Sequence, residues 1–577
     1  MHEFNFMKLL VTVLMCTLFM PYSFGQIINQ YDIIIDEIMI DPSPAVGLPN
    51  SEFIELKNIS NITFNLSGLQ IIDANSTATI NISYELKPDS FVIICSNSSV
   101  SQFSAIGPSI RVSNFPSLDN EAEMLYIRSK ENKTIHAVNY TKRWYNNTLK
   151  AEGGWSLEMI DCRNPCNGSG NWSASIDVKG GTPGKINSIN AILSDRTPPA
   201  IIGGYATDSL HIILVFSEPL DSNAAALPDH YIITEGNISI VQANPVPPLF
   251  DRILLKAGGA LQINKIYTVA VQHITDCSGN EIDKGKSANV GWASSASEND
   301  IIINEILFNP KPLGVDYVEL YNRSEKIIDT KDLYITNRNS TGIPNIAKQV
   351  STENRLLFPG KFLLITEDSF ITQQEYRVKQ PDVLIELNPL PSFPDDKGTV
   401  LLLNNQGSIV DELQYDAKWH FTLIDNAEAV ALERMDYNKP TQDKQNWHSA
   451  ATNAGYGTPG YQNSQYIPPE KIKGTIDITP ETFSPDNDGF DDVATINFQF
   501  PEPGYVCNIS IFDANGRLMK SLVRNALCGI KGYFRWDGLD EQNKRLNIGV
   551  YIILTDIFNV NGNTKRYKNT IVLARRL

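Results

Sequence analysis

The sequence predicts an all-β protein made of several sandwich domains in tandem. Short apolar runs recur along the chain, with Gly, Pro, Asn and Asp between them, as in strands joined by turns. No window shows the helical spacing of apolar residues. A pattern of strands at residues 33–58 returns at residues 301–322, which indicates that at least one domain is duplicated.

The repeated pattern is an apolar strand, a proline-rich break and a second strand that ends in Glu-Leu-x-Asn. The first strands are residues 33–39 and 301–307, and the second strands are residues 52–58 and 316–322. A Leu-Glu pair, an Asn-Trp pair and a Gly-Thr-Pro-Gly turn follow in the same order in both copies. We therefore expect two sister domains that differ mainly in their loops, at residues 27–190 and 299–465.

Length and charge limit what the protein can be. A chain of 577 residues is long enough for several domains, each with its own core. Its formal net charge of −17 argues against nucleic acid as a partner, because an acidic surface repels phosphate.

Residues 1–25 are predicted to be a signal peptide. Lys8 precedes an apolar run at residues 9–20, and small residues stand just before the expected cleavage at Gln26. The run is too short for a membrane span, and no later segment is apolar enough for one. Cys16 lacks the small preceding residue that lipoprotein processing needs, which favours a soluble secreted protein.

The ordered motifs of the two copies resemble those of the lamin tail domain. The resemblance implies an Ig-like β-sandwich for each copy, and an interaction role in bacterial surface proteins. Nuclear lamins use the domain to contact proteins and DNA, but an acidic, exported chain gives no reason to expect DNA binding here. The fold class expected for the whole chain is therefore all-β, with tandem Ig-like β-sandwich domains.

The remaining two stretches resemble other Ig-like domains. Residues 195–296 carry Val-Phe-Ser-Glu-Pro-Leu at 215–220 and Ile-Thr-Asp-Cys-Ser-Gly-Asn at 274–280, and are similar to a bacterial Ig-like domain of surface-layer proteins. Residues 472–577 are similar to the C-terminal Ig-like domain of flagellar hook-capping and gliding-motility-associated proteins. That resemblance implies sorting by the type IX secretion machinery.

Two pairs of glutamates are the obvious candidates for chemistry. Glu37 with Glu55, and Glu305 with Glu319, could act as general acid and base, as carboxylate pairs do in glycosidases. Their neighbours are Ile, Leu and Met, and the same positions are duplicated together with the fold. We therefore expect structural hydrogen bonds to backbone or loop rather than catalysis.

An acidic segment is the candidate metal site. Asp486, Asp488, Asp491 and Asp492 could hold Ca²⁺ through clustered carboxylate oxygens. The spacing departs from the helix-loop-helix calcium pattern, because Thr495 stands where that pattern requires Glu. The alternative is an Asx-rich turn before a strand. Apart from this Ca²⁺, the sequence predicts no cofactor.

Cysteines outside the predicted signal peptide are even in number, which permits disulfides in an oxidising compartment. We expect Cys162 to pair with Cys166, and Cys507 with Cys528. Cys95 follows an apolar strand and is expected to be a buried free thiol. No ligand spacing typical of zinc is present.

Tryptophans gather late in each copy. Trp144 and Trp172 recur in register as Trp419 and Trp447, which favours positions in the core. Trp155 has no aromatic counterpart in the second copy. It is the predicted surface residue for stacking on a ligand such as a sugar ring.

Recognisable catalytic motifs are absent from the sequence, including His-Glu-x-x-His, Gly-x-Ser-x-Gly and phosphate-binding glycine loops. The prediction is a non-catalytic protein, secreted or on the outer cell surface, for adhesion, structure or protein interaction. Its partner would be an extracellular protein or glycan. Two alternatives stay open: a carbohydrate-binding accessory protein of polysaccharide uptake, and a hydrolase whose site is assembled by loops.

Overall fold

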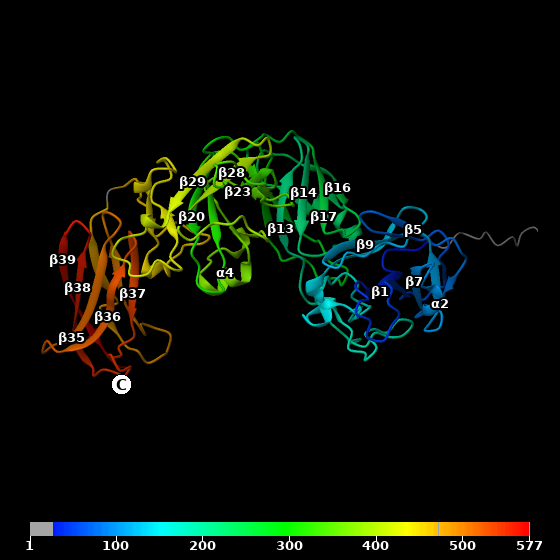
Figure 1. Ribbon diagram of the computed structural model, residues 1–577, viewed down its shortest axis with the longest axis horizontal. Coiled ribbons are helices and arrows are strands. Elements are labelled where there is room, and N and C mark those ends of the chain that lie inside the picture. The colour runs from blue at the N-terminus through cyan, green and yellow to red at the C-terminus, as the bar shows by residue number, and fades with distance from the viewer. Residues whose placement is uncertain (1–26, 471, 576–577) are drawn as a thin grey trace, which may run out of the picture. The chain divides into compact units, whose positions relative to one another are not determined.

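The structure is a computed structural model that describes residues 27–470 and 472–575. The predicted signal peptide, residues 1–25, lies outside the described residues. The all-β prediction is confirmed, since the described chain folds into sheets with only short helices between strands (Figure 1). Among the described helices, none is long and apolar enough to cross a membrane. They are α2 (Val100–Phe103), α3 (Ser222–Ala225) and α4 (Ser369–Glu375), with 3-10 turns η1 (Lys142–Tyr145), η2 (Lys150–Glu152), η3 (Ser169–Asn171), η4 (Pro228–His230), η5 (Thr330–Asp332), η6 (Pro381–Val383), η7 (Ala417–Trp419), η8 (Lys444–Asn446) and η9 (Thr452–Ala454).

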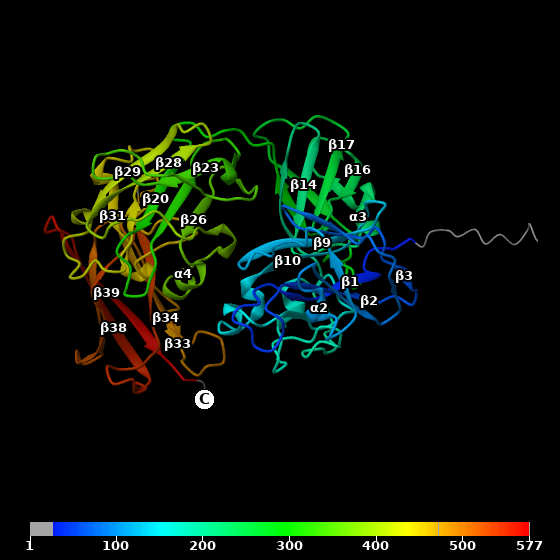
Figure 2. The same cartoon turned by 45° about the vertical axis from the view of Figure 1, so that its right-hand side comes forward.

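The first repeat is a sandwich of a large and a small sheet, whose facing strands enclose an aliphatic core (Figure 2). The large sheet has the order β12 (Trp172–Ala174), β11 (Leu157–Met159), β1 (Ile33–Met39), β2 (Phe53–Asn58), β7 (Phe91–Ser96) and β8 (Ser109–Val112). The small sheet has the order β10 (Thr134–Thr141), β9 (Ala122–Arg128), β4 (Gln70–Ile72) and β5 (Thr77–Thr79), and β3 (Phe64–Asn65) pairs with β6 (Glu85–Leu86).

The second repeat has the same strand order, which matches the duplication read from the sequence. Its large sheet is β31 (Trp447–Ser449), β30 (Leu432–Arg434), β20 (Ile301–Leu307), β21 (Tyr317–Asn322), β26 (Phe362–Thr366) and β27 (Leu384–Glu386). Its small sheet is β29 (Ile409–Asp416), β28 (Lys397–Asn404), β23 (Leu333–Thr336) and β24 (Lys348–Gln349), and β22 (Ile328–Asp329) pairs with β25 (Leu356–Leu357).

The same β-bulge occurs in both copies, in the first strand of each repeat, which lies inside the large sheet. The register of β1 on β2 shifts between Ile35 and Glu37, and that of β20 on β21 shifts between Ile303 and Glu305. Ile35 and Ile303 pack in the cores between the sheets. The extra residue lets the glutamate that follows turn to the opposite face, where loops cover it. The bulge explains how a glutamate can stand within the otherwise largely apolar strands β1 and β20.

The other two domains are smaller sandwiches. In the domain after the first repeat, one sheet has the order β13 (Ile201–Ala206), β14 (His211–Phe216), β17 (Arg252–Ala257) and β16 (Ile240–Pro245). The other sheet has the order β15 (Tyr231–Ile233), β18 (Tyr267–Val271) and β19 (Ser287–Val290). In the last domain, one sheet has the order β32 (Thr475–Thr479), β34 (Ala494–Gln499) and β37 (Lys531–Trp536). The other sheet has the order β33 (Thr482–Phe483), β39 (Thr564–Leu573), β38 (Gly549–Phe558), β35 (Val506–Asp513) and β36 (Leu518–Leu527).

The chain divides into two compact units. The first unit contains the first repeat and most of the domain that follows it. The second unit contains the rest of that domain, the second repeat and the last domain. Each unit is described by itself below.

Candidate functional site

Three glutamates form a row across the large sheet of the first repeat. Glu37 on β1 is the register partner of both Glu55 on β2 and Glu158 on β11. All three side chains are fully buried. The sequence predicted the first two as a pair and missed Glu158, although its Leu-Glu motif is shared by both copies.

The Gly-Thr-Pro-Gly turn closes this row. The backbone N–H of Thr182 donates to Oε1 of Glu37 at 2.8 Å, and its hydroxyl donates to Oε1 of Glu158 at 2.9 Å. The backbone N–H of Gly184 donates to Oε2 of Glu55. Each glutamate is therefore bonded to the same turn, which confirms the predicted structural hydrogen bonds to backbone and loop.

The two glycines of this turn are needed for different reasons. A Cβ atom on Gly181 would lie 2.6 Å from Oε1 of Glu37, so a side chain there would push the turn off the glutamate row. Gly184 has a φ of +81°, a conformation that favours glycine and that aims its N–H at the row. The motif is thus a cap fitted to buried carboxyl groups.

The second repeat builds the same row from Glu305, Glu319 and Glu433, which are also fully buried. Thr458 donates from its backbone N–H to Glu305 at 2.9 Å and from its hydroxyl to Glu433 at 2.8 Å. The N–H of Gly460 donates to Glu319 at 2.5 Å. The duplicated contacts show that the row is a feature of the fold rather than of one copy.

Burial raises the pKa of five of these carboxyl groups, those of Glu37, Glu55, Glu305, Glu319 and Glu433. Loss of solvation, followed by the charge of Glu158, raises the pKa of Glu37 to about 8. Loss of solvation, followed by the charge of Glu305, raises the pKa of Glu433 to about 8. A glycosidase pair needs one ionised carboxylate that reaches the substrate. Enclosed carboxyl groups that are bonded to a turn fit a structural role instead.

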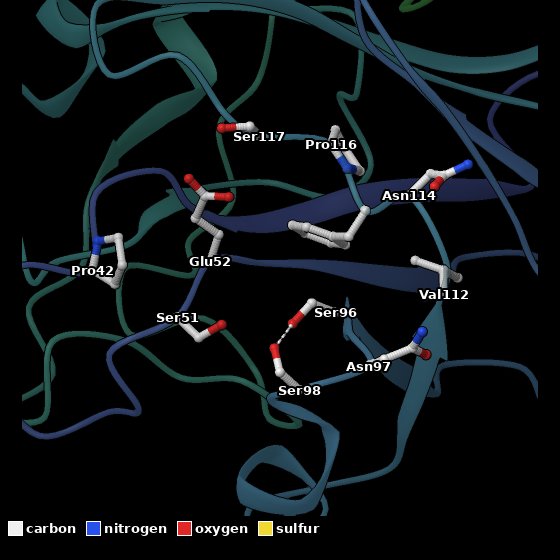
Figure 3. A pocket seen from close by; sticks show the side chains of 11 residues that line it. Pro42, Ser51, Glu52, Ser96, Asn97, Ser98, Val112, Asn114, Pro116 and Ser117 are labelled. Atoms are coloured by element: carbon white, nitrogen blue, oxygen red, sulfur yellow. Dashed lines mark hydrogen bonds between the residues drawn. The ribbon is translucent and has the colours of Figure 1, made fainter.

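A hollow of about 590 Å³ lies on the surface of the first repeat, above the β7–β8 edge (Figure 3). Hydroxyl groups, side-chain amides and one carboxyl line it, and Phe115 adds an aromatic ring. Burial, followed by the charges of Glu123 and Asp41, raises the pKa of Glu52 to about 7. Such a wall offers donors and acceptors to a polar, ring-shaped ligand. The lining residues are Pro42, Ser51, Glu52, Ser96, Asn97, Ser98, Val112, Asn114, Phe115, Pro116 and Ser117.

The tryptophans that recur in both copies lie in or against the cores, as the repeat predicts. Trp172 and Trp447 are buried, while Trp144 and Trp419 are partly buried and pack on the cores. Trp155 is also partly buried, and the ammonium of Lys150 lies 4.2 Å from its ring centroid. A sugar stacked on this ring would have to displace that lysine.

The acidic turn of the last domain brings three of its four predicted residues together. Carboxylate oxygens of Asp486, Asp488 and Asp492 lie within 4.8 Å of one another, whereas Asp491 is outside this group. The N–H groups of Asn487 and Gly489 already donate to the two oxygens of Asp492, at 2.5 and 2.9 Å. Asx turns are also present, because the N–H of Asp488 donates to Oδ1 of Asp486 at 3.2 Å and the N–H of Phe490 donates to Oδ1 of Asp488 at 2.9 Å. Ca²⁺ binding by these carboxylates stays a prediction.

A second group of carboxylates was missed by sequence reasoning. Asp195, Glu218 and Asp276 come within 4.8 Å of one another, although they are far apart in the chain. Oδ2 of Asp195 is buried without a hydrogen-bond partner among the described residues. Burial, followed by the charges of Asp276 and Asp195, raises the pKa of Glu218 to about 7.

The predicted disulfide between Cys162 and Cys166 is wrong. Cys166 forms a disulfide with Cys277, which is 111 residues away, and not with Cys162. Cys162 instead accepts a hydrogen bond from the ammonium of Lys57 at 3.2 Å. A short sequence gap favoured the wrong partner because chain separation does not report distance in the fold.

The other predicted disulfide is not formed in the structure. Cys507 and Cys528 are both buried free thiols. Burial, followed by a hydrogen bond with Cys507, raises the pKa of Cys528 well above its usual range, and the thiol of Cys528 donates to the carbonyl of Ala526 at 3.6 Å. Cys95 is a buried free thiol, as predicted.

Among solved structures, the N-terminal part of the bacterial S-layer protein SbsC is 19% identical, with a TM-score of 0.16, and the match covers 28% of this chain and 44% of that one. CopC from Methylosinus trichosporium OB3b is 15% identical, with a TM-score of 0.14, over 18% of this chain and 97% of that one. A Ca²⁺-stabilized adhesin of an Antarctic bacterium is 10% identical, with a TM-score of 0.12, over 95% of this chain and all of that one (100%).

The chain thus spans less than half of the SbsC fragment that it matches. No curated protein matches the sequence. The resemblance of the two copies is supported by a family model, since residues 28–142 and 294–417, which include the repeated opening strands, both match the lamin tail domain.

Proposed function

We propose that this chain is a non-catalytic binding protein, secreted or held on the outer cell surface, whose domains present loops and sheet faces to extracellular partners. The observation that supports this best is the enclosure of both glutamate rows. The carboxyl groups that would have to perform acid–base chemistry are fully buried and bonded to the Gly-Thr-Pro-Gly turns. Because these glutamates serve the scaffold in both repeats, we expect partners to bind at the loops, which differ between the two copies.

A paired assay of turnover and binding tests this proposal. The exported chain, from Gln26 onward, is incubated with panels of glycans, peptides and esters, and is also applied to arrays of extracellular glycans and proteins. Reproducible binding without turnover supports the proposal. Turnover that disappears in Glu37→Gln or Glu305→Gln would overturn it. Protease shaving of intact cells gives the location, and retention inside the cell would contradict the surface assignment.

A second candidate is a carbohydrate-binding accessory protein of polysaccharide uptake. It is favoured by the hollow of the first repeat, where Phe115 stands among Ser and Asn side chains beside Glu52. Aromatic rings beside hydrogen-bonding groups suit sugar rings. Phe115→Ala and Asn97→Ala should weaken glycan binding, and Phe370→Ala, an exposed aromatic on α4, is the matched control. If Trp155→Ala abolishes glycan binding while Phe115→Ala and Asn97→Ala do not, the glycan binds at Trp155 and not in the hollow.

The last domain, residues 472–577, is proposed as the sorting address for type IX secretion. The support is the sequence resemblance of this segment alone. Deleting the domain should move the protein from the cell surface to the periplasm without lowering the total amount. Normal surface display of the truncated chain would end this proposal.

A further inference from the structure

A cavity of about 900 Å³ lies within the second compact unit, between the end of the second repeat and the last domain. The two domains meet directly beside it. The N–H of Ile530 donates to the carbonyl of Ser464 at 2.8 Å, and the N–H of Gly529 donates to the side-chain oxygen of Asn453 at 3.0 Å. The cavity walls therefore come from two domains that are hydrogen-bonded to each other.

Three cationic side chains line this cavity in a chain whose net charge is −17. Arg377 and Lys379 come from the segment after α4, and Lys531 comes from β37. Among the described residues, no carboxylate forms an ion pair with any of the three. Burial, followed by the charges of Arg377 and Lys531, lowers the pKa of Lys379, so the cations repel one another. An anion among them would relieve that repulsion.

Aromatic rings and amides stand beside the cations. Tyr461, Tyr466 and Tyr533 line the cavity, and the ammonium of Lys379 lies 3.6 Å from the ring centroid of Tyr461. Side-chain amides of Asn453, Gln462 and Asn497 provide further donors and acceptors. Lys379 lies over Tyr461, and Tyr466 is stacked on Tyr437 with ring centroids 4.6 Å apart, so a sugar ring would meet the edges of these rings rather than open faces. The amides, ring edges and cations together fit a ligand that carries hydroxyl groups and acidic groups.

We propose that this cavity binds an acidic saccharide, such as a stretch of uronate residues. The lining also holds two carboxylates, Glu470 and Asp477, which favour a ligand that carries hydroxyl donors beside its acidic groups. Each uronate residue carries free ring hydroxyl groups as well as its carboxylate, and these hydroxyls can donate to Asp477, which also accepts from the amide of Asn497 at 3.2 Å. The inference needs only this cavity, and it is independent of the hollow of the first repeat and of the sorting role of the last domain.

Calorimetric titration of the whole exported chain tests the proposal, with a galacturonate oligomer, a neutral galactose oligomer of equal length, free sulfate and an oligonucleotide as probes. The galacturonate oligomer should bind with an affinity that falls as salt is raised. Lys379→Gln and Lys531→Gln should each raise its Kd by about threefold to fivefold, and together by about tenfold. Lys379→Arg keeps the charge and should restore most of the affinity.

Lys565→Gln is the matched control, because Lys565 also lies over a tyrosine ring, at 4.4 Å from Tyr567, but outside the cavity. Its Kd should equal that of the unmodified chain. Equal binding of the neutral oligomer, equal loss in the control, or binding of sulfate or oligonucleotide as tight as that of galacturonate would each overturn the proposal. Failure of galacturonate to bind at millimolar concentration would do the same.

Discussion

Thr182 donates its backbone N–H to the carboxyl group of Glu37 at 2.8 Å, although 145 residues separate them in the chain. Thr458 makes the same bond to Glu305 across 153 residues. These contacts tie the end of each repeat to its first strand. The Gly-Thr-Pro-Gly turn is thus the element that closes each sandwich.

Removing the hydroxyl of Thr458 should destabilise the second repeat. Thr458→Val removes the hydroxyl that lies between the buried carboxyl groups of Glu305 and Glu433, at a cost of about 2–3 kcal/mol, although Tyr317 and Ser464 still donate to them. Urea unfolding followed by tryptophan fluorescence measures the loss. Thr458→Ser keeps the hydroxyl and should restore most of the stability, while the exposed Glu325→Ala should change little. Equal stability of the Val variant would show that the turn is dispensable.

Stability of the second repeat should depend on the protonation of Glu433. Its folded pKa of about 8 lies above the ordinary value of a glutamate, so the folded state binds more protons between the two values. The free energy of unfolding should therefore be highest in acid and should fall as the pH rises through about 8. Glu433→Gln, which stays neutral, should flatten this fall. Parallel pH curves for the two proteins would refute the assignment.

The disulfide Cys166–Cys277 should stabilise the first compact unit. It links residues 111 apart, and a loop of that length is worth about 4–5 kcal/mol when loop closure is counted as entropy. Replacing both cysteines with serine should lower the melting temperature, whereas Cys162→Ser should lower it far less. Peptide mapping without reductant should recover the two peptides joined. Recovery of a peptide that contains a Cys162–Cys166 disulfide would show that the pairing with Cys277 is wrong.

Calcium should raise the melting temperature of the last domain if its acidic turn binds the ion. Binding to the folded state alone adds about 2.7 kcal/mol at a hundredfold excess over Kd. Asp486→Asn with Asp488→Asn should abolish the effect of added CaCl₂. Asp540→Asn is the control, because Asp540 also accepts backbone N–H bonds in an Asx-type turn, at 2.9 and 2.8 Å. An unchanged melting temperature in CaCl₂ would leave the segment as a plain turn.

The sequence by itself determined the fold class and the duplication. Apolar runs separated by turn residues specify strands, and repeated motifs specify sister domains, because both signals are local or depend only on order along the chain. The same reasoning placed Glu37, Glu55, Glu305 and Glu319 in structural roles, and their bonds to the turns confirm it.

Tertiary structure alone decided which distant residues meet. Glu158 joins its row, and Cys277 reaches Cys166, because strand order in a sandwich brings together segments that are remote in the chain. The cations Arg377, Lys379 and Lys531 gather around one cavity for the same reason. A sequence records the chemistry of each residue, whereas proximity comes from how the sheets pack and how the domains meet.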